Sequence, residues 1–260
     1  MRTIFSILTL SFFCLIFQNR TFAQDENTGY AKVEYMKVKS GMWDKYVACE
    51  KAWKLVHEYR VRQGLITGWE FEQVLIPAGT NNEYDFLTVT LYKDWKSLYT
   101  ETDWYTAAMK SLPADKREIA EKAEDYRDIV KTEIWSAGDL AGNPGAKFRV
   151  ENFMRIPEGG WQKWIEMESK FVKPVHEKNI AAGNRAGWLL AFMDLPRGSD
   201  LPYQASTVDY FDKWEDMAKD EGKAWKEVYP DLSWGDINRK IEGTRVIART
   251  EVRMLLDSVR

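Results

Sequence analysis

The chain of 260 residues contains two histidines, and both occupy the same local setting. His57 and His176 each stand between a valine and a glutamate, and a second glutamate, Glu50 or Glu168, lies about two helical turns before each. A helix places residues at this spacing on about the same face. Histidine is the usual general base or proton shuttle near neutral pH, and a neighbouring carboxylate can orient its ring. We therefore expect two candidate sites for proton transfer, with the catalytic residues His57, His176, Glu50 and Glu168.

Two structural alternatives stay open for these histidines. A histidine near the end of a helix can act as a C-terminal cap, because its cation is stabilised by the negative end of the helix dipole. A histidine and a glutamate on one helix face can also bind a metal ion, but the sequence shows no third ligand beside them. The spacing therefore leaves catalysis and capping both open, and it predicts no metal site.

Aromatic residues recur at fixed distances from the histidines. Trp69 and Trp188 each follow a histidine by 12 residues, and Tyr84 and Tyr203 each follow a Pro-x-Gly-Ser/Thr loop. Such residues in a pocket between a sheet and its helices would suit a flat, largely apolar small molecule. We take these four as candidate ligand-binding residues. The alternative is that the aromatic side chains belong to the core and that the loop residues serve only the turn.

These matches belong to an internal repeat. Residues 56–95 and 175–214 share histidine, glycine, proline and tryptophan positions at a constant offset of 119 residues (176 − 57). At the start of the preceding helix the offset is 118 (161 − 43), so the second copy holds one additional residue before His176. A helix often absorbs such an insertion as a π-bulge. A kink at Pro174 is the alternative.

The polarity patterns predict the same elements in each copy: strand, helix, strand, strand, helical region and strand. This order defines a ferredoxin-like βαββαβ unit, whose sheet carries helices on one face only. Two such sheets can bury their bare faces against each other. We therefore expect an α+β fold in which two tandem ferredoxin-like units form an intramolecular dimeric α+β barrel. The first unit spans residues 28–138, a Gly/Pro-rich linker spans 139–147, and the second unit spans 148–257.

On element order, unit length and internal repeat, the two halves resemble the dimeric α+β barrel superfamily. This group includes antibiotic-biosynthesis monooxygenases, haem-degrading monooxygenases and NIPSNAP-type proteins. The resemblance covers nearly the whole chain after its N-terminal segment and rests on no signature motif. It implies a protein that binds or transforms a small molecule, and, if an enzyme, a cofactor-poor one similar to a monooxygenase or an isomerase. One fold hosts many functions, so a non-enzymatic envelope protein with a binding or assembly role is the alternative.

One short stretch is similar to the haem-degrading members of that group. Residues 150–152 resemble their first strand, in which an asparagine matters, so Asn152 is a candidate ligand-binding residue. Those proteins also place a haem-ligating histidine on the second helix, and the comparable residues 222–225 contain none. This departure argues against haem degradation, and no cofactor is expected. The chain also lacks the CxxC, P-loop, GxGxxG and HExxH motifs.

Residues 1–23 have the pattern of a secretory signal peptide. Arg2 precedes an apolar run over residues 4–17, and Ala23 offers a small residue at the cleavage site. The run is shorter than the ~20 apolar residues that span a bilayer, so we expect cleavage and no stable membrane insertion. The expected location is periplasmic or secreted. Cys49 would then be the only cysteine, which predicts no internal disulfide.

The charge balance bears on the partners of the protein. The chain has 37 Lys and Arg against 40 Asp and Glu, a formal net charge of −3 at pH 7, and 45% hydrophobic residues. A mildly acidic chain without a long basic run is unsuited to nucleic acid, whose phosphates require a positive surface. We therefore expect a small-molecule ligand and no nucleic-acid partner.

Overall fold

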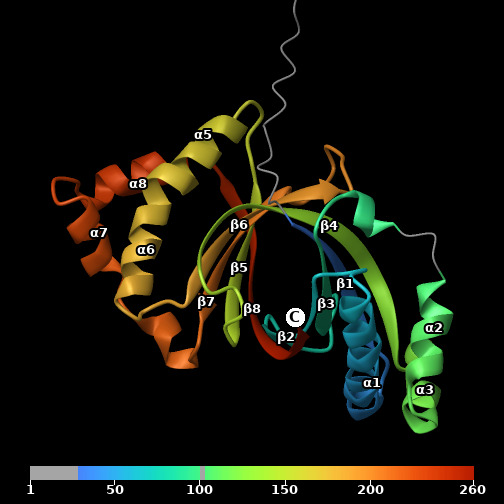
Figure 1. Ribbon diagram of the computed structural model, residues 1–260. Coiled ribbons are helices and arrows are strands. Elements are labelled where there is room, and N and C mark those ends of the chain that lie inside the picture. The colour runs from blue at the N-terminus through green and yellow to red at the C-terminus, as the bar shows by residue number, and fades with distance from the viewer. Residues whose placement is uncertain (1–28, 100–102) are drawn as a thin grey trace, which may run out of the picture.

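The computed structural model describes residues 29–99 and 103–260, so the predicted signal peptide lies outside the described residues. Within these ranges eight strands close into one barrel, in the order β1-β3-β2-β8-β5-β7-β6-β4 (Figure 1). The neighbouring strands are antiparallel. The expected α+β fold with a closed barrel is therefore confirmed. The strands are β1 (Tyr30–Val38), β2 (Gly68–Ile76), β3 (Phe86–Tyr92), β4 (Arg127–Gly142), β5 (Phe148–Arg155), β6 (Gly187–Leu195), β7 (Ala205–Phe211) and β8 (Val246–Val259).

Helices cover the outside of the barrel in two groups, one from each half of the chain (Figure 1). The first group is α1 (Trp43–Arg62), η1 (Lys96–Leu98), α2 (Trp104–Ser111), α3 (Ala114–Glu121) and α4 (Ala123–Tyr126). The second is α5 (Trp161–Glu166), η2 (Met167–Val172), α6 (Lys173–Ala181), η3 (Trp214–Ala218), α7 (Gly222–Val228) and α8 (Trp234–Glu242). No helix in the described part of the chain is long and apolar enough to cross a membrane.

Each half of the chain contributes four adjacent strands to the barrel. The first half supplies β4-β1-β3-β2, and the second supplies β8-β5-β7-β6. The halves join where β2 pairs with β8 and where β4 pairs with β6. The barrel therefore has no free sheet edge, and its interior is shared by both halves.

The closing strands β4 and β8 are longer than the sequence predicts. The first part of β4 pairs with β1 and its last part pairs with β6, so residues 139–142 of the predicted linker belong to a strand. Gly138 has the residue type of a turn, but it serves packing. A Cβ atom on Gly138 would lie 2.3 Å from the ring of Phe192 on β6, which is closer than atoms can approach. Glycine is therefore required where the two strands meet.

The insertion before His176 forms a π-helix. The six residues of η2, Met167–Val172, adopt π-helical geometry between α5 and α6, at the place where the offset between the copies changes. The predicted π-bulge is therefore confirmed. Pro174 stands in the first turn of α6, directly after the π-helix.

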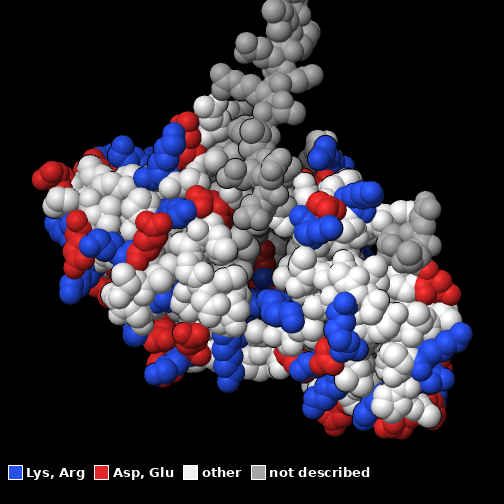
Figure 2. Space-filling model, viewed as in Figure 1, with Lys and Arg blue, Asp and Glu red and all other residues white. Residues whose placement is uncertain are grey.

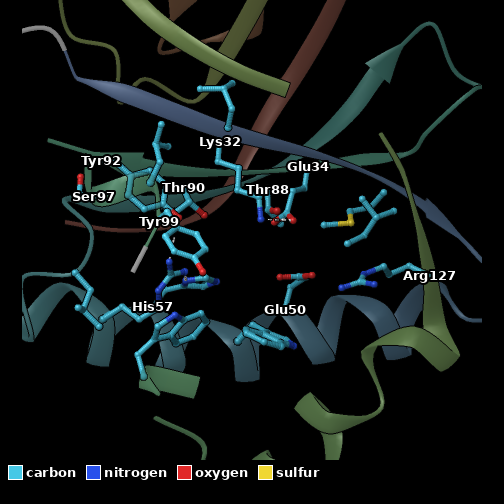
Figure 3. A pocket seen from close by; sticks show the side chains of 18 residues that line it. Lys32, Glu34, Glu50, His57, Thr88, Thr90, Tyr92, Ser97, Tyr99 and Arg127 are labelled. Carbon is cyan, nitrogen blue, oxygen red and sulfur yellow. Dashed lines mark hydrogen bonds and ion pairs between the residues drawn. The ribbon is translucent and has the colours of Figure 1, made fainter. Parts of the chain in front are cut away.

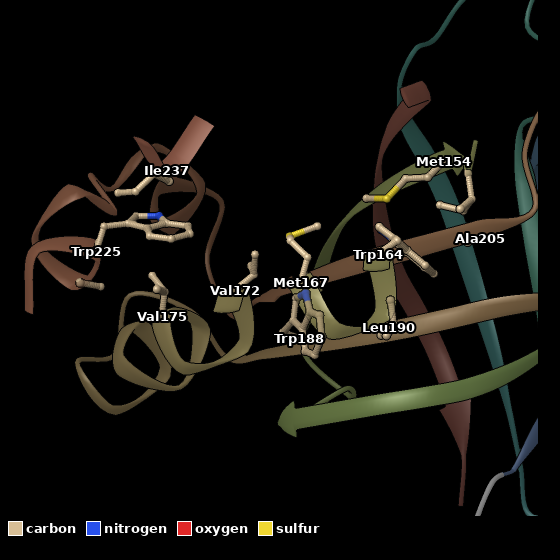
Figure 4. Packing of buried hydrophobic residues seen from close by; sticks show 12 residues of the cluster. Met154, Trp164, Met167, Val172, Val175, Trp188, Leu190, Ala205, Trp225 and Ile237 are labelled. Atoms are coloured by element: carbon tan, nitrogen blue, oxygen red, sulfur yellow. The ribbon is translucent and has the colours of Figure 1, made fainter. Parts of the chain in front are cut away.

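Side chains alternate along each strand, so one face of the sheet points into the barrel interior and the other points toward the helices. On β1, Val33 and Tyr35 point into the barrel interior, where they join a cluster that includes Leu87, Trp135 and Phe153. The opposite faces of the strands meet the helices. In the second half this helix layer is a continuous apolar core of 12 buried residues, which Figure 4 shows between α5, η2, α6, α7 and the strands.

Candidate functional site

A cavity of about 490 Å³ lies between α1 and the face of β1 and β3 that points away from the barrel interior (Figure 3). We call it the α1 cavity. Its ionisable and polar lining residues are Glu50, His57 and Arg60 from α1, Lys32 and Glu34 from β1, Thr88, Thr90 and Tyr92 from β3, Ser97 and Tyr99 at η1, and Arg127 from β4. Its apolar walls include Trp53, Trp104, Ile129 and Ile134.

Local structure explains why these side chains converge. On β1, Lys32 and Glu34 alternate with the inward-pointing Val33 and Tyr35, so both face α1. They pair with each other at 2.7 Å. On α1, the cavity residues recur every three or four positions, from Glu50 through Trp53 and His57 to Arg60, which is one face of a helix.

His57 is held in one orientation by two neighbours. Its ring stacks on Trp69, with ring centroids 4.8 Å apart and planes at 14°. Arg60 donates to its Nδ1 at 3.2 Å. Burial first, and then the Arg60 and Lys32 cations, lower the pKa of His57 well below its usual range. Because an arginine can only donate, Nδ1 is the unprotonated nitrogen and Nε2 carries the proton. His57 is therefore a neutral hydrogen-bond donor at Nε2, poorly suited to act as a general base.

Glu50 is the group in the α1 cavity that titrates near neutrality. Burial raises the pKa of Glu50 to about 7, and the Tyr46 hydroxyl and Arg127 guanidinium only partly oppose this rise. The carboxyl group is 4% exposed and points into the cavity (Figure 3). A carboxylic acid with a pKa near 7 can both accept and donate a proton at physiological pH.

The matching region of the second half is occupied by charged side chains that pair with one another. We call it the α6 site, and its polar residues are Glu168, His176, Arg185, Asp209, Glu221 and Arg245. His176 stacks on Trp188 with ring centroids 5.2 Å apart, and its Nδ1 accepts from Arg185. Arg185 also forms ion pairs with Asp209 and Glu221. Burial, and then the Arg185 and Arg245 cations, lower the pKa of His176 well below its usual range.

One pair of matched residues differs between the halves. Glu168 and Arg245 match Glu50 and Arg127 at an offset of 118 residues. Arg245 lies 3.2 Å from Glu168 and forms an ion pair with it. Arg127 forms no ion pair within the described ranges, and it faces Glu50 across the α1 cavity (Figure 3). The same two residues are therefore in contact in one half and separated by open space in the other.

The four predicted aromatic ligand-binding residues lie elsewhere. Trp69 and Trp188 are buried behind the histidines, where they form the floors of the two stacks. Tyr84 and Tyr203 lie inside the barrel and are 0% and 4% exposed. None of the four lines the α1 cavity.

The two tyrosines connect the halves. Tyr84 donates to Glu251 of the second half at 2.5 Å, and Tyr203 donates to Glu133 of the first half at 2.8 Å. Each tyrosine thus satisfies a buried glutamate on the closing strand of the opposite half. Asn152, the other predicted ligand-binding residue, accepts a hydrogen bond from Thr250 at 2.8 Å and lies on β5, away from the α1 cavity.

Sequence reasoning did not find Arg60, Arg127, Lys32 or Thr90. Matching between the copies selects residues that both share, whereas several residues of the α1 cavity differ between them. Thr90 matches Asp209, and Arg60 matches an asparagine. These residues could therefore have been found by looking, near the matched histidines, for positions at which the two halves differ.

The fold is that of the dimeric α+β barrel proteins. Similar solved structures include two suspected monooxygenases, one from Lactobacillus acidophilus NCFM (9% identity, TM-score 0.50, 88% of this chain and 93% of that chain) and one from Fusobacterium nucleatum subsp. nucleatum (8%, 0.50, 89% and 93%). A haem-binding protein from Thermus thermophilus is also similar (14%, 0.50, 88% and 93%). At these identities the likeness shows the fold alone. No protein-family model matches the chain, and no curated protein sequence is significantly similar to it.

The residues of this chain do not fit haem held by a histidine of the second helical region. The comparable residues 222–225 open α7, and Ala224 and Trp225 are buried there in the apolar core. The nearby His176 has its Nδ1 engaged by Arg185 and its ring face covered by Trp188. No step of a reaction is therefore assigned to haem.

Proposed function

We propose that this protein binds one small, largely apolar organic molecule in the α1 cavity and that Glu50 exchanges a proton with it. In this isomerase-like reaction the Glu50 carboxylate takes a proton from one ligand atom and returns it to another, so that no cofactor is consumed. His57 donates from Nε2 to an oxygen of the ligand and stabilises the negative charge that develops there.

The difference between the two halves carries this proposal. Both halves keep a stacked histidine, a buried glutamate and an arginine, and the cavity of about 490 Å³ lies beside Glu50 and His57 of the first half. That volume lies within the range of ~300–1,000 Å³ that is common for small-molecule sites. At the α6 site, Arg185 and its carboxylate partners take the corresponding position. The first half is therefore suited to binding a small molecule, whereas the second half uses the corresponding space for ion pairs that stabilise the fold.

Keeping Glu50 buried is unfavourable for folding, which also supports a role in chemistry. A carboxyl group whose pKa is raised by burial destabilises the folded state above its ordinary pKa. A glutamine of the same shape would avoid this cost. Groups with strongly perturbed pKa values inside a cavity are typical of catalytic sites.

Native mass spectrometry of the protein purified from its natural host tests the binding step, because a retained molecule would be detected and identified. The proton-transfer step is tested by incubating that molecule with the protein in D₂O and following deuterium incorporation by NMR. Glu50→Gln should abolish incorporation and keep binding, whereas the matched control Glu168→Gln should keep both. Binding without incorporation in the wild-type protein would favour a non-enzymatic binding protein.

Two further features belong to the same proposal. We propose that the halves are tandem ferredoxin-like units that arose by duplication, which the strand orders β4-β1-β3-β2 and β8-β5-β7-β6 support. We also propose export to the periplasm or beyond, which rests on the signal-like residues 1–23. N-terminal sequencing of the natural protein tests export: a start near Gln24 supports it, and a retained Met1 contradicts it.

A further inference from the structure

Arg60 differs from the other buried arginines in the described parts of the chain. The other three, Arg149, Arg185 and Arg253, each form ion pairs with carboxylates. Arg60 is 7% exposed and forms no ion pair within residues 29–99 and 103–260. Its guanidinium contacts His57 Nδ1 at 3.2 Å, the Tyr92 hydroxyl at 3.1 Å and the face of Trp104 at 4.2 Å. A buried charge without a counter-ion is costly, so this arginine indicates that an anion binds beside it.

Arg127 is a second cation in the same cavity. It is half-buried, and it lacks an ion-pair partner in the described ranges, with a buried Nε that has no hydrogen-bond acceptor there. Glu34, the other carboxylate that lines the α1 cavity, is already paired with Lys32 at 2.7 Å. The α1 cavity therefore presents two guanidinium groups, and Glu50 is the remaining carboxyl group that could balance them.

The α6 site shows what balances the same arrangement in the second half. Asp209 faces Val150 across β5 and β7, as Thr90 faces Lys32 across β1 and β3. At Thr90 the first half thus has a neutral side chain where the second half has a carboxylate. Asp209 and Glu221 both pair with Arg185, which donates to its histidine as Arg60 does. The second half supplies its own anions, and the first half has room for an external one.

We propose that the ligand of the α1 cavity is an organic carboxylate on a flat, apolar body, and that its carboxylate binds against Arg60, as Asp209 and Glu221 bind against Arg185 in the second half. This inference rests on the proposed function and names the class of its ligand. A flat body is favoured by the walls of the cavity, where Trp53 and Trp104 present aromatic rings. The Trp53 indole is fixed, because its Nε1 donates to the Ala120 carbonyl at 3.2 Å.

Binding of 2-naphthoate and of its neutral counterpart 2-naphthamide, followed by calorimetry and tryptophan fluorescence, tests this inference. The wild-type protein should bind naphthoate at least about tenfold more tightly than naphthamide, because charge-assisted hydrogen bonds to arginine are the stronger ones. Arg60→Gln should weaken naphthoate binding by roughly ten- to a hundredfold and leave naphthamide binding nearly unchanged. The control Arg245→Gln, in the second half, should change neither affinity.

A second variant places the internal anion of the α6 site in the first half. Thr90→Asp should put a carboxylate beside Arg60, abolish naphthoate binding and raise the melting temperature of the free protein. Equal affinity for acid and amide, or an unchanged acid affinity in Arg60→Gln, would overturn the carboxylate ligand and leave the proposed function standing. If neither probe binds and the protein from its natural host retains no molecule, both proposals fail.

Discussion

Replacing Glu50 by glutamine should stabilise the protein above neutral pH. Burial raises the pKa of Glu50 from 4.5, the usual value of an exposed glutamate, to about 7. At about 1.4 kcal/mol per pKa unit, keeping this group buried costs about 3 kcal/mol once the pH exceeds 7. Below pH 4 the carboxyl group is protonated in both the folded and unfolded chain, so the cost vanishes there. Stability is therefore lost as pH rises between these limits, and Glu50→Gln removes that loss.

The assay is urea unfolding of wild-type and Glu50→Gln protein at pH 4, 6 and 8. The free energy of unfolding of the variant should exceed that of the wild type by up to about 3 kcal/mol at pH 8 and by almost nothing at pH 4. In thermal unfolding at pH 8 this gain corresponds to a rise of roughly 6–12 °C in Tm for a chain of this size. The charged groups that face Glu50 from other elements are Arg127 and Glu34, and both remain in the variant. Glu168→Gln should gain less, because it deprives Arg245 of its ion pair. A loss of stability at pH 8, or an equal gain at both extremes, would refute this reasoning.

Three other predictions concern the scaffold. Tyr84→Phe and Tyr203→Phe should each lower the free energy of unfolding by about 1.5–3 kcal/mol, because a buried glutamate loses a hydrogen bond. Chemical denaturation should show losses of similar size for the two variants, and an unchanged stability of either would contradict its hydrogen bond to the other half. Gly138→Ala should lower the free energy of unfolding by about 1–3 kcal/mol through overlap with Phe192, and adding Phe192→Leu should restore part of that loss. An unchanged stability of Gly138→Ala would mean that the two strands separate easily. His57→Phe keeps the stack on tryptophan but removes the acceptor of Arg60, so thermal unfolding should show a loss of about 1–3 kcal/mol, and an unchanged Tm would argue against that hydrogen bond.

Periodic patterns and matched residues were sufficient to predict most of the fold. The polarity patterns predicted the order strand, helix, strand, strand, which β1, α1, β2 and β3 follow. The change of offset before His176 predicted the π-helix. The ends of the closing strands were missed, because Gly138 has the residue type of a turn although its role is to admit a neighbouring ring. A residue type alone does not say which of these two constraints selected it.

The candidate site was predicted in part. The pairing of His57 with Glu50 in one cavity was expected, but their chemical roles were not, since the pKa values depend on burial and on Arg60. The matched tyrosines were predicted as ligand contacts. In the structure each donates a hydrogen bond to a glutamate of the other half, and Tyr203 also lines a second cavity. Residues that match between the two halves include those that join the halves in the barrel, such as Tyr84 and Tyr203. The site depends on what differs, as at Thr90, and a search for matches passes over such positions.

The exchange of hydrogen bonds between Tyr84 and Glu251 and between Tyr203 and Glu133 has a consequence for how this chain can change over time. Each half completes the interior of the other, so a substitution at one of these positions affects both halves. The helices outside contact the opposite half mainly at their edges, through the ion pairs Lys54–Asp257 and Lys173–Asp139. One half can fill its outer space with side chains while the other keeps it open, and the barrel remains the same. A barrel interior shared by both halves, with a separate helix layer on each half, thus lets one half specialise in chemistry while the other half loses that function.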